Sequence, residues 1–154
     1  MQMDRDALQR FLGEAFPQVA EDFAVEEVSE DRLRVRLRTA ERHLRPGGTV
    51  SGPTMFALAD VGVYLAILAR LGPVALAVTT NCSIDFLRKP AAGRDLLAEV
   101  RILKMGRVLA VGDVLIRSEG SDDVVARASL TYSIPPAGGP PKGMEAAASQ
   151  GPPR

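Results

Sequence analysis

The chain has 154 residues, 46% of them hydrophobic, which suits one globular domain with a buried core. Nineteen basic residues balance nineteen acidic residues. This balance argues against nucleic acid and membrane surfaces as partners, because binders of both carry a basic excess. The single cysteine, Cys82, excludes a disulfide within the chain, and with a single histidine, His43, we expect no cysteine–histidine metal site.

The first ten residues include the charged side chains of Asp4, Arg5, Asp6 and Arg10 and lack the apolar run of a signal peptide, so we expect a cytoplasmic protein. A short amphipathic helix is predicted from Asp4 to Phe16, because apolar residues recur there at helical spacing and Pro17 follows. Two strands are predicted next, Phe23–Val28 and Arg32–Arg38. In the second strand, apolar residues alternate with arginines, which indicates one buried face and one solvated face.

A glycine-rich loop, Ala40–Gly52, leads to one long helix, Pro53–Leu71, with Ser51 as its expected N-cap. This helix is apolar on nearly every side, so the rest of the domain must cover most of its surface. The charge of Asp60 interrupts the apolar run, which favours a buried core helix over a membrane span.

Four longer strands are predicted after the helix: Val74–Leu87, Asp95–Leu103, Val108–Ser118 and Val124–Ile134. Turn residues separate them at roughly regular spacing, which is typical of an antiparallel meander. We therefore predict an α+β fold in which a curved antiparallel sheet wraps one long helix. The single domain spans residues 1–135, and the proline- and glycine-rich segment 136–154 is expected to be a flexible tail.

Two stretches resemble a known family. The residues from Gly47 to Asp60 (GGTVSGPTMFALAD) resemble the signature of hotdog-fold thioesterases, in particular the PaaI-like group that acts on phenylacetyl-CoA and 4-hydroxybenzoyl-CoA. The segment Val78–Leu87 resembles the central strand of that family, followed by its usual turn. The resemblance implies a hotdog fold of about six strands around one long helix, with an additional short N-terminal helix. It also implies acyl-CoA thioesterase activity without a cofactor, because coenzyme A is part of the substrate.

Asp60 is the main candidate for catalysis. It lies in an apolar helix with no basic residue three or four positions away, and burying a lone carboxylate is costly unless it is paired or hydrogen-bonded. One interpretation is a structural aspartate that caps a neighbouring loop. The other, which the resemblance favours, is a nucleophile or a general base for water. The sequence does not separate these two catalytic roles.

Gly52 and Thr79 are the other predicted catalytic residues. Gly52 begins the helix, where free backbone amides and the helix dipole favour negative charge, although a glycine that merely starts a helix has the same sequence. By the resemblance, Gly52 of one subunit faces Asp60 of another. Thr79 is expected to position water, or to be an ordinary strand residue. Because Thr79 and Thr80 alternate faces, only one of them points at the site.

Substrate binding is predicted for residues just before the long helix, on the strand that follows it and in a basic turn. Ser51 and Arg45 stand where the family has histidine and asparagine, and Arg45 is able to pair with a carboxylate or phosphate unless it is simply solvated. Thr80 is the alternative to Thr79, and Arg88 and Lys89 suit the phosphates of coenzyme A.

The sequence and the resemblance leave three candidate functions. The first is an acyl-CoA thioesterase. The second is a non-catalytic acyl-CoA-binding or regulatory hotdog protein, which the replaced histidine and asparagine motivate. The third, a hotdog dehydratase, is discounted because the long helix contains no histidine. The fold leaves an unpaired edge strand, so a homodimer or a dimer of dimers is expected.

Overall fold

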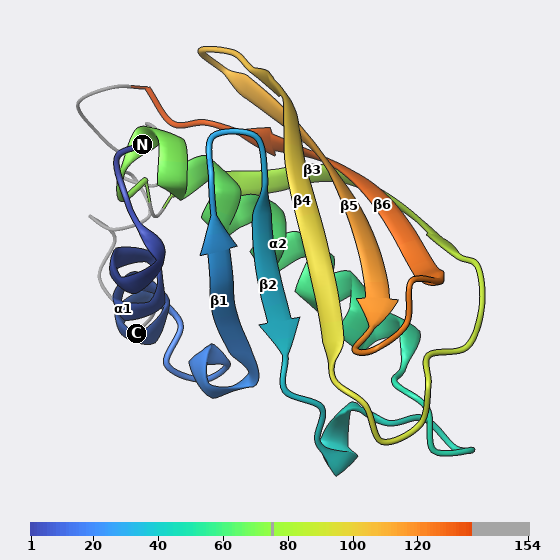
Figure 1. Ribbon diagram of the computed structural model, residues 1–154. Coiled ribbons are helices and arrows are strands. Elements are labelled where there is room, and N and C mark those ends of the chain that lie inside the picture. Colours follow the sequence, from blue (N-terminus) through green and yellow to red (C-terminus); the bar gives the residue numbers. More distant parts are fainter. Residues whose placement is uncertain (75, 137–154) are drawn as a thin grey trace, which may run out of the picture.

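A computed structural model describes residues 1–74 and 76–136 of the chain. It contains two α-helices and six strands, with two short 3₁₀ turns (Figure 1). In chain order the elements are α1 (Arg5–Ala15), η1 (Ala20–Asp22), β1 (Phe23–Val28), β2 (Leu33–Leu37), η2 (Glu41–His43), α2 (Gly52–Leu71), β3 (Val78–Phe86), β4 (Leu96–Met105), β5 (Leu109–Ser118) and β6 (Val124–Ser133).

All six strands form one antiparallel sheet in the order β1-β2-β4-β5-β6-β3. The sheet curves around α2, which lies against its concave face (Figure 1). The alternation in β2 fixes which face is inside: Leu33, Val35 and Leu37 are buried. The chain therefore has the α+β arrangement that the sequence predicts, with β1 and β3 at the two edges of the sheet.

The sequence of α2 explains its central position. Ser51 caps the helix, because its hydroxyl oxygen accepts a hydrogen bond from the amide of Thr54, and Gly72 ends it with a φ of 88°. Of the described helices, α2 alone is long and apolar enough to cross a membrane, yet 61% of its apolar window is buried inside the protein. Its apolar surface is thus accounted for by contact with the sheet.

Gly62 of α2 packs closely against strand β4. A Cβ atom added there would lie 2.8 Å from a methyl group of Val100, a fully buried residue of β4. We expect Gly62→Ala to lower the free energy of unfolding by about 1–2 kcal/mol, because the cost of overpacking exceeds the gain in helix propensity. Urea unfolding measures this difference. Gly13→Ala in α1, where an added Cβ meets nothing within 4 Å, is the matched control and should not destabilise. Equal effects of the two substitutions would contradict the packing argument.

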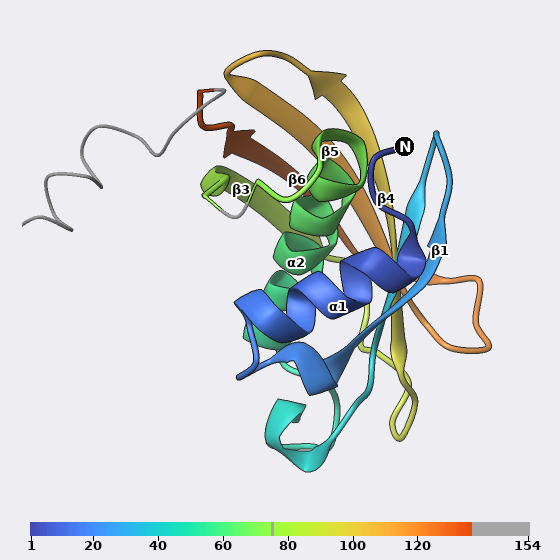
Figure 2. The same cartoon turned by 90° about the vertical axis from the view of Figure 1, so that its left-hand side faces the viewer.

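The N-terminal helix α1 is anchored to β1 and closes one side of the molecule (Figure 2). The side chain of Gln9 donates to the carbonyl of Phe23 at 3.1 Å and accepts from the amide of Val25 at 2.8 Å. Leu8 and Leu12 are fully buried. This anchoring places the end of α1 and the turn η1 beside the part of α2 that the sheet leaves uncovered.

Two predicted segments differ from the structure. The predicted strand Val74–Leu87 begins only at Val78, because the amides of Val74 and Ala77 bond back to Gly72 and Val74 in a turn after the helix. The predicted loop Ala40–Gly52 contains the turn η2, which ends at His43. The predicted tail 136–154 lies outside the described residues, apart from its first residue.

Candidate active site

A groove of about 660 Å³ runs along the side of α2 that the sheet does not cover. The exposed stripe of α2 forms its floor, the end of α1 with η1 forms one wall, and the start of β3 forms the other. Its lining is mainly apolar and aromatic, which suits the acyl part of a small molecule. The lining residues are Phe16, Val19, Asp22, Phe23, Leu37, His43, Pro53, Thr54, Phe56, Ala57, Asp60, Val61, Tyr64, Ala77, Val78, Thr79 and Tyr132.

Asp60 lines this groove, and two hydroxyl groups hold its carboxylate. The hydroxyl of Thr79 donates to Asp60 Oδ1 at 2.5 Å, and the hydroxyl of Tyr132 lies 2.7 Å from the same oxygen. Among the described residues, no donor is hydrogen-bonded to Oδ2. One oxygen is therefore held in place, while the other remains available for a water molecule or an acyl carbon.

Tyr132 is a site residue that the sequence analysis missed. It extends inward from β6, opposite Thr79 in the pairing of β3 with β6. Burial, together with the hydrogen bond to Asp60, raises the pKa of Tyr132, so its hydroxyl stays protonated and donates. The inward-facing alternation of β6 was the only available signal, and it does not distinguish a tyrosine that holds a carboxylate from one that fills the core.

Removing the Tyr132 hydroxyl tests its part in holding Asp60. We expect Tyr132→Phe to lower kcat for thioester hydrolysis about tenfold with little change in KM, because the carboxylate loses one of its two donors but the ring still fills its place. Steady-state kinetics over a range of pH check this, and the pH dependence of kcat should also shift. A fall in thermal stability with an unchanged kcat and pH profile would mean that the hydroxyl serves only the fold.

Aromatic rings continue the groove away from Asp60. The ring of Phe16 meets that of Tyr64 edge-on with centroids 5.7 Å apart, and Tyr64 lies 6.2 Å from the ring of Tyr132. Burial raises the pKa of Tyr64. These rings give the groove an aromatic wall.

Gly52 lies at the start of α2, as predicted, but away from Asp60 of the same chain. Eight residues of α-helix separate them, which corresponds to about 12 Å along the axis. The ring of Phe86 covers Gly52, since a Cβ added there would lie 3.2 Å from it. One thioester carbonyl therefore cannot contact both the Gly52 amide and the Asp60 carboxylate of a single chain.

The structure separates the predicted substrate-binding residues. Ser51 acts as the helix cap, and Thr80 points away from Asp60 and donates to the carbonyl of Thr131 at 3.2 Å. Arg45, Arg88 and Lys89 are exposed and do not line the groove. Arg88 forms an ion pair with Asp123 at 3.3 Å. Of the two adjacent threonines, Thr79 is the one that faces the site, and its catalytic role stays a prediction.

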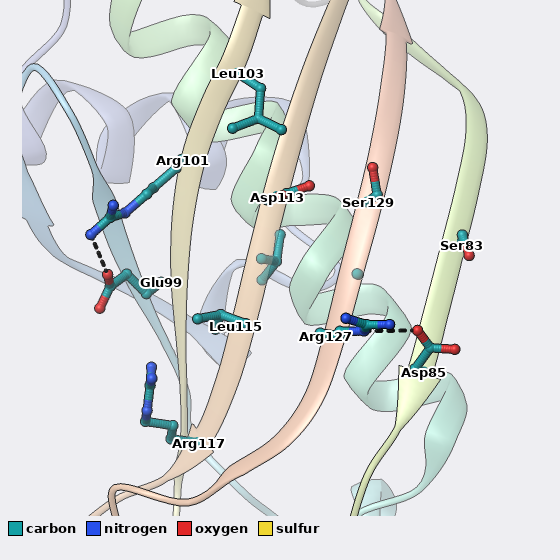
Figure 3. Close-up of a pocket in the computed structure, with 12 residues that line it drawn as sticks. Ser83, Asp85, Glu99, Arg101, Leu103, Asp113, Leu115, Arg117, Arg127 and Ser129 are labelled. Carbon is teal, nitrogen blue, oxygen red and sulfur yellow. Dashed lines mark hydrogen bonds and ion pairs between the residues drawn. The ribbon is translucent and has the colours of Figure 1, made fainter.

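A second hollow, of about 770 Å³, lies on the opposite face of the sheet from α2 (Figure 3). Charged side chains cross it, including the pairs Arg127–Asp85 at 2.9 Å and Arg101–Glu99 at 3.5 Å. The sheet separates this surface from Asp60. Within residues 1–74 and 76–136, no group of three or more histidine, cysteine or acidic side chains is placed to hold a metal ion.

Comparison with known proteins identifies the family. Residues 47–130, more than half of the chain, match the family model described as the thioesterase superfamily. A protein of Silicibacter sp. TM1040, provisionally named a thioesterase, is 58% identical with a TM-score of 0.82, over 87% of this chain and 93% of that chain.

Two further solved structures share the fold. A mutant of the phenylacetic acid degradation protein PaaI from Thermus thermophilus is 28% identical with a TM-score of 0.66, over 77% of this chain and 98% of that chain. A hypothetical thioesterase from Streptococcus pneumoniae, solved with coenzyme A, is 21% identical with a TM-score of 0.70, over 83% of this chain and 96% of that chain. The predicted resemblance is confirmed: the chain belongs to the thioesterase superfamily and has the hotdog fold.

Proposed function

We propose that this protein is an acyl-CoA thioesterase whose catalytic carboxylate is Asp60. The observation that carries the proposal is the position of that carboxylate, half-buried in an apolar groove with one oxygen fixed by Thr79 and Tyr132. A carboxylate held in this way has a defined direction for its second oxygen. General-base and nucleophilic catalysis both require such positioning.

Two chemical routes fit this arrangement. In the first, Asp60 takes a proton from water as the water oxygen bonds to the thioester carbonyl carbon, and the tetrahedral intermediate then expels the coenzyme A thiolate. In the second, Asp60 itself attacks the carbonyl and expels the thiolate, leaving an anhydride that water hydrolyses. Single turnover in water enriched in oxygen-18 separates them. Label in the Asp60 carboxylate would contradict the water route, and label only in the released acid would contradict an anhydride that water opens at the Asp60 carbonyl.

The proposed active site combines two copies of the chain. The Gly52 amide and the Asp60 carboxylate are too far apart to act on one carbonyl within a chain, as their helical separation requires. Among the described strands, β3 lies at an edge of the sheet beside β6, and it carries the exposed side chains of Val78 and Phe86. Pairing of this edge with a second copy removes the unpaired backbone groups. Such a dimer also supports an active site in which Gly52 of the partner subunit polarises the thioester carbonyl.

Coenzyme A is the proposed carrier of the acyl group. The Streptococcus pneumoniae protein of the same fold was solved with coenzyme A. In this chain, Arg88 and Lys89 follow β3 on the surface and offer positive charge for its phosphates. A cytoplasmic location, where acyl-CoA substrates are made and used, is part of the same proposal.

Release of free coenzyme A thiol from a panel of aromatic, short-chain and long-chain acyl-CoAs tests the function. We expect at least one member to be hydrolysed at a rate that greatly exceeds the uncatalysed rate. The alternative, a non-catalytic acyl-CoA-binding protein, predicts binding by calorimetry with no thiol release from any member. Neither binding nor hydrolysis across the panel would contradict both functions.

A further inference from the structure

A buried histidine is fixed between two segments of the chain. His43 is only 7% exposed, and its Nε2 lies 3.2 Å from Asp22 Oδ2 in the turn η1. Its Nδ1 accepts a hydrogen bond from the amide of Ala40 at 2.9 Å, so the hydrogen of the neutral ring is on Nε2, facing Asp22. Burial and the nearby charge of Arg42 lower the pKa of His43, which keeps the ring neutral. Both ring nitrogens therefore have a partner that holds them.

The backbone of the same histidine holds the start of α2. The carbonyl oxygen of His43 accepts a hydrogen bond from the amide of Ser51 at 2.8 Å. Ser51 caps α2 through its hydroxyl oxygen and directly precedes Gly52. A continuous series of contacts within one chain therefore leads from the Asp22 carboxylate, through His43, to the residue before Gly52.

The first turn of α2 leaves the Gly52 amide as a free donor. The amides of Thr54 and Met55 bond to the hydroxyl and carbonyl oxygens of Ser51. Within residues 1–74 and 76–136, no acceptor is bonded to the Gly52 amide. Its hydrogen lies in the plane of the peptide that joins Ser51 to Gly52. A contact that fixes the backbone of Ser51 therefore also fixes the direction of this donor.

We propose that His43 is a positioning residue, which aims the Gly52 amide at the thioester carbonyl through its bond to Ser51. This inference rests on the proposed function, in which that amide polarises the carbonyl bound at Asp60 of the partner subunit. A preorganised donor stabilises the negative charge that develops on the carbonyl oxygen, and a small misplacement weakens this effect. The ring of His43 lines the groove of its own chain, but its backbone contact leads to the donor that its chain supplies to the other site.

Two substitutions loosen the histidine in different ways. His43→Phe keeps a ring of similar shape without its hydrogen bonds, and Asp22→Ala keeps the histidine but removes its anchor. We expect each variant to lower kcat on the best acyl-CoA by about tenfold to a hundredfold with little change in KM, because the donor is misaimed but still present. Gln9→Met is the matched control. It removes a half-buried side chain that holds the backbone of β1 and does not line the groove, so it should keep the kcat of wild type.

Mixing subunits shows which half of the site His43 serves. Refolding His43→Phe together with Asp60→Asn should restore about a quarter of wild-type activity, because half of the dimers are mixed and one of their two sites has an intact carboxylate and a well-aimed donor. Refolding His43→Phe with Gly52→Pro should give no more activity than the two variants alone, because both changes affect the same half. Asp22→Ala should behave as His43→Phe does in both mixtures.

The outcomes separate this inference from the function on which it rests. Thermal melts establish that each variant is folded, and folded His43→Phe and Asp22→Ala with the kcat of wild type would overturn the inference. Recovery with Gly52→Pro and none with Asp60→Asn would also overturn it, since His43 would then serve the carboxylate of its own chain. Absence of hydrolysis by wild type would overturn the proposed function itself. Failure of Asp60→Asn and Gly52→Pro to restore activity to each other would overturn the site made by two chains.

Discussion

Asp60→Asn is expected to lower kcat for acyl-CoA hydrolysis about a thousandfold, with a much smaller change in KM. Asparagine keeps the shape of the side chain, and its carbonyl oxygen still accepts hydrogen bonds from Thr79 and Tyr132. The negative charge is lost, and with it both the ability to take a proton from water and the ability to attack a carbonyl. Steady-state release of thiol on the best substrate measures the effect.

A matched control separates this loss from a general effect of removing an acidic residue. Asp113→Asn changes an exposed carboxylate on β5, on the face of the sheet opposite α2 (Figure 3). It should leave kcat unchanged. If Asp60→Asn hydrolysed every substrate as fast as wild type, the catalytic assignment would be wrong, and Asp60 would be a structural residue that holds β3 and β6 against α2.

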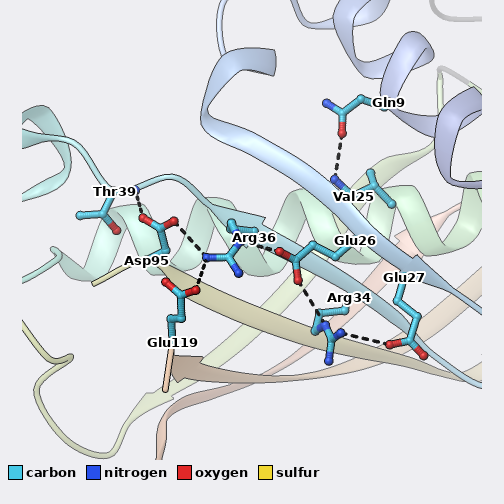
Figure 4. Close-up of polar contacts among 9 residues, drawn as sticks. All are labelled: Gln9, Val25, Glu26, Glu27, Arg34, Arg36, Thr39, Asp95 and Glu119. Atoms are coloured by element: carbon cyan, nitrogen blue, oxygen red, sulfur yellow. Dashed lines mark hydrogen bonds and ion pairs between the residues drawn. The ribbon is translucent and has the colours of Figure 1, made fainter. Parts of the chain in front are cut away.

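Arg36→Met is expected to lower the free energy of unfolding by about 2–3 kcal/mol, the largest stability effect of a single polar side chain in this account. Arg36 is only 22% exposed and lies among three carboxylates (Figure 4). Its guanidinium contacts Glu26 at 2.5 Å, Asp95 at 3.0 Å and Glu119 at 3.1 Å. Hydrogen bonding to Glu26 raises the pKa of Arg36 above its usual value. Methionine keeps the apolar stem but leaves three negative charges close together.

Comparing the urea unfolding of the Arg36→Met and Arg101→Met variants measures how much this cluster contributes to the free energy of unfolding. Arg101 is 61% exposed and pairs with Glu99 at 3.5 Å, so its replacement should cost well under about 1 kcal/mol. The cluster links β1 and β2 to the ends of β4 and β5, and its loss should therefore affect the whole sheet. Equal effects of the two substitutions would show that the Arg36 cluster behaves as ordinary surface charge.

Local patterns in the sequence predicted most of the fold. The alternation of arginines with apolar residues in β2 predicts a half-buried strand, and the nearly continuous apolar surface of α2 predicts a helix that the rest of the domain covers. The boundary of β3 was missed because Val74 and Ala77 are as apolar as the strand that follows. Their place in a turn depends on hydrogen bonds to the end of α2, which no local pattern encodes.

The candidate site was predictable where one residue was anomalous by itself. Asp60 stands out as a charge in an apolar helix, and Gly52 is tied to it by the spacing of the family signature. Tyr132 carries no such anomaly, since a tyrosine in a strand is ordinary. It becomes a site residue only when the pairing of β6 with β3 and the packing of the sheet on α2 bring it beside Asp60. The proximity of these residues follows from the tertiary structure and is not encoded in any local sequence pattern.

Mixing two inactive variants tests whether the proposed hydrolytic site combines Asp60 of one chain with Gly52 of the partner subunit. Asp60→Asn removes the carboxylate. Gly52→Pro removes the amide hydrogen. The backbone suits proline, because Ser51 is extended (φ −74°, ψ 156°) and Gly52 starts the helix, but the ring of Phe86, 3.2 Å from an added Cβ, must shift slightly, so a thermal melt checks that the variant is folded.

Each variant alone should be nearly inactive. Unfolded together and refolded, they should recover about a quarter of wild-type activity, because half of the dimers are mixed and each mixed dimer contains one intact site of two. Native mass spectrometry confirms that mixed dimers form. Mixed dimers that hydrolyse acyl-CoA no faster than the two variants alone would contradict the account.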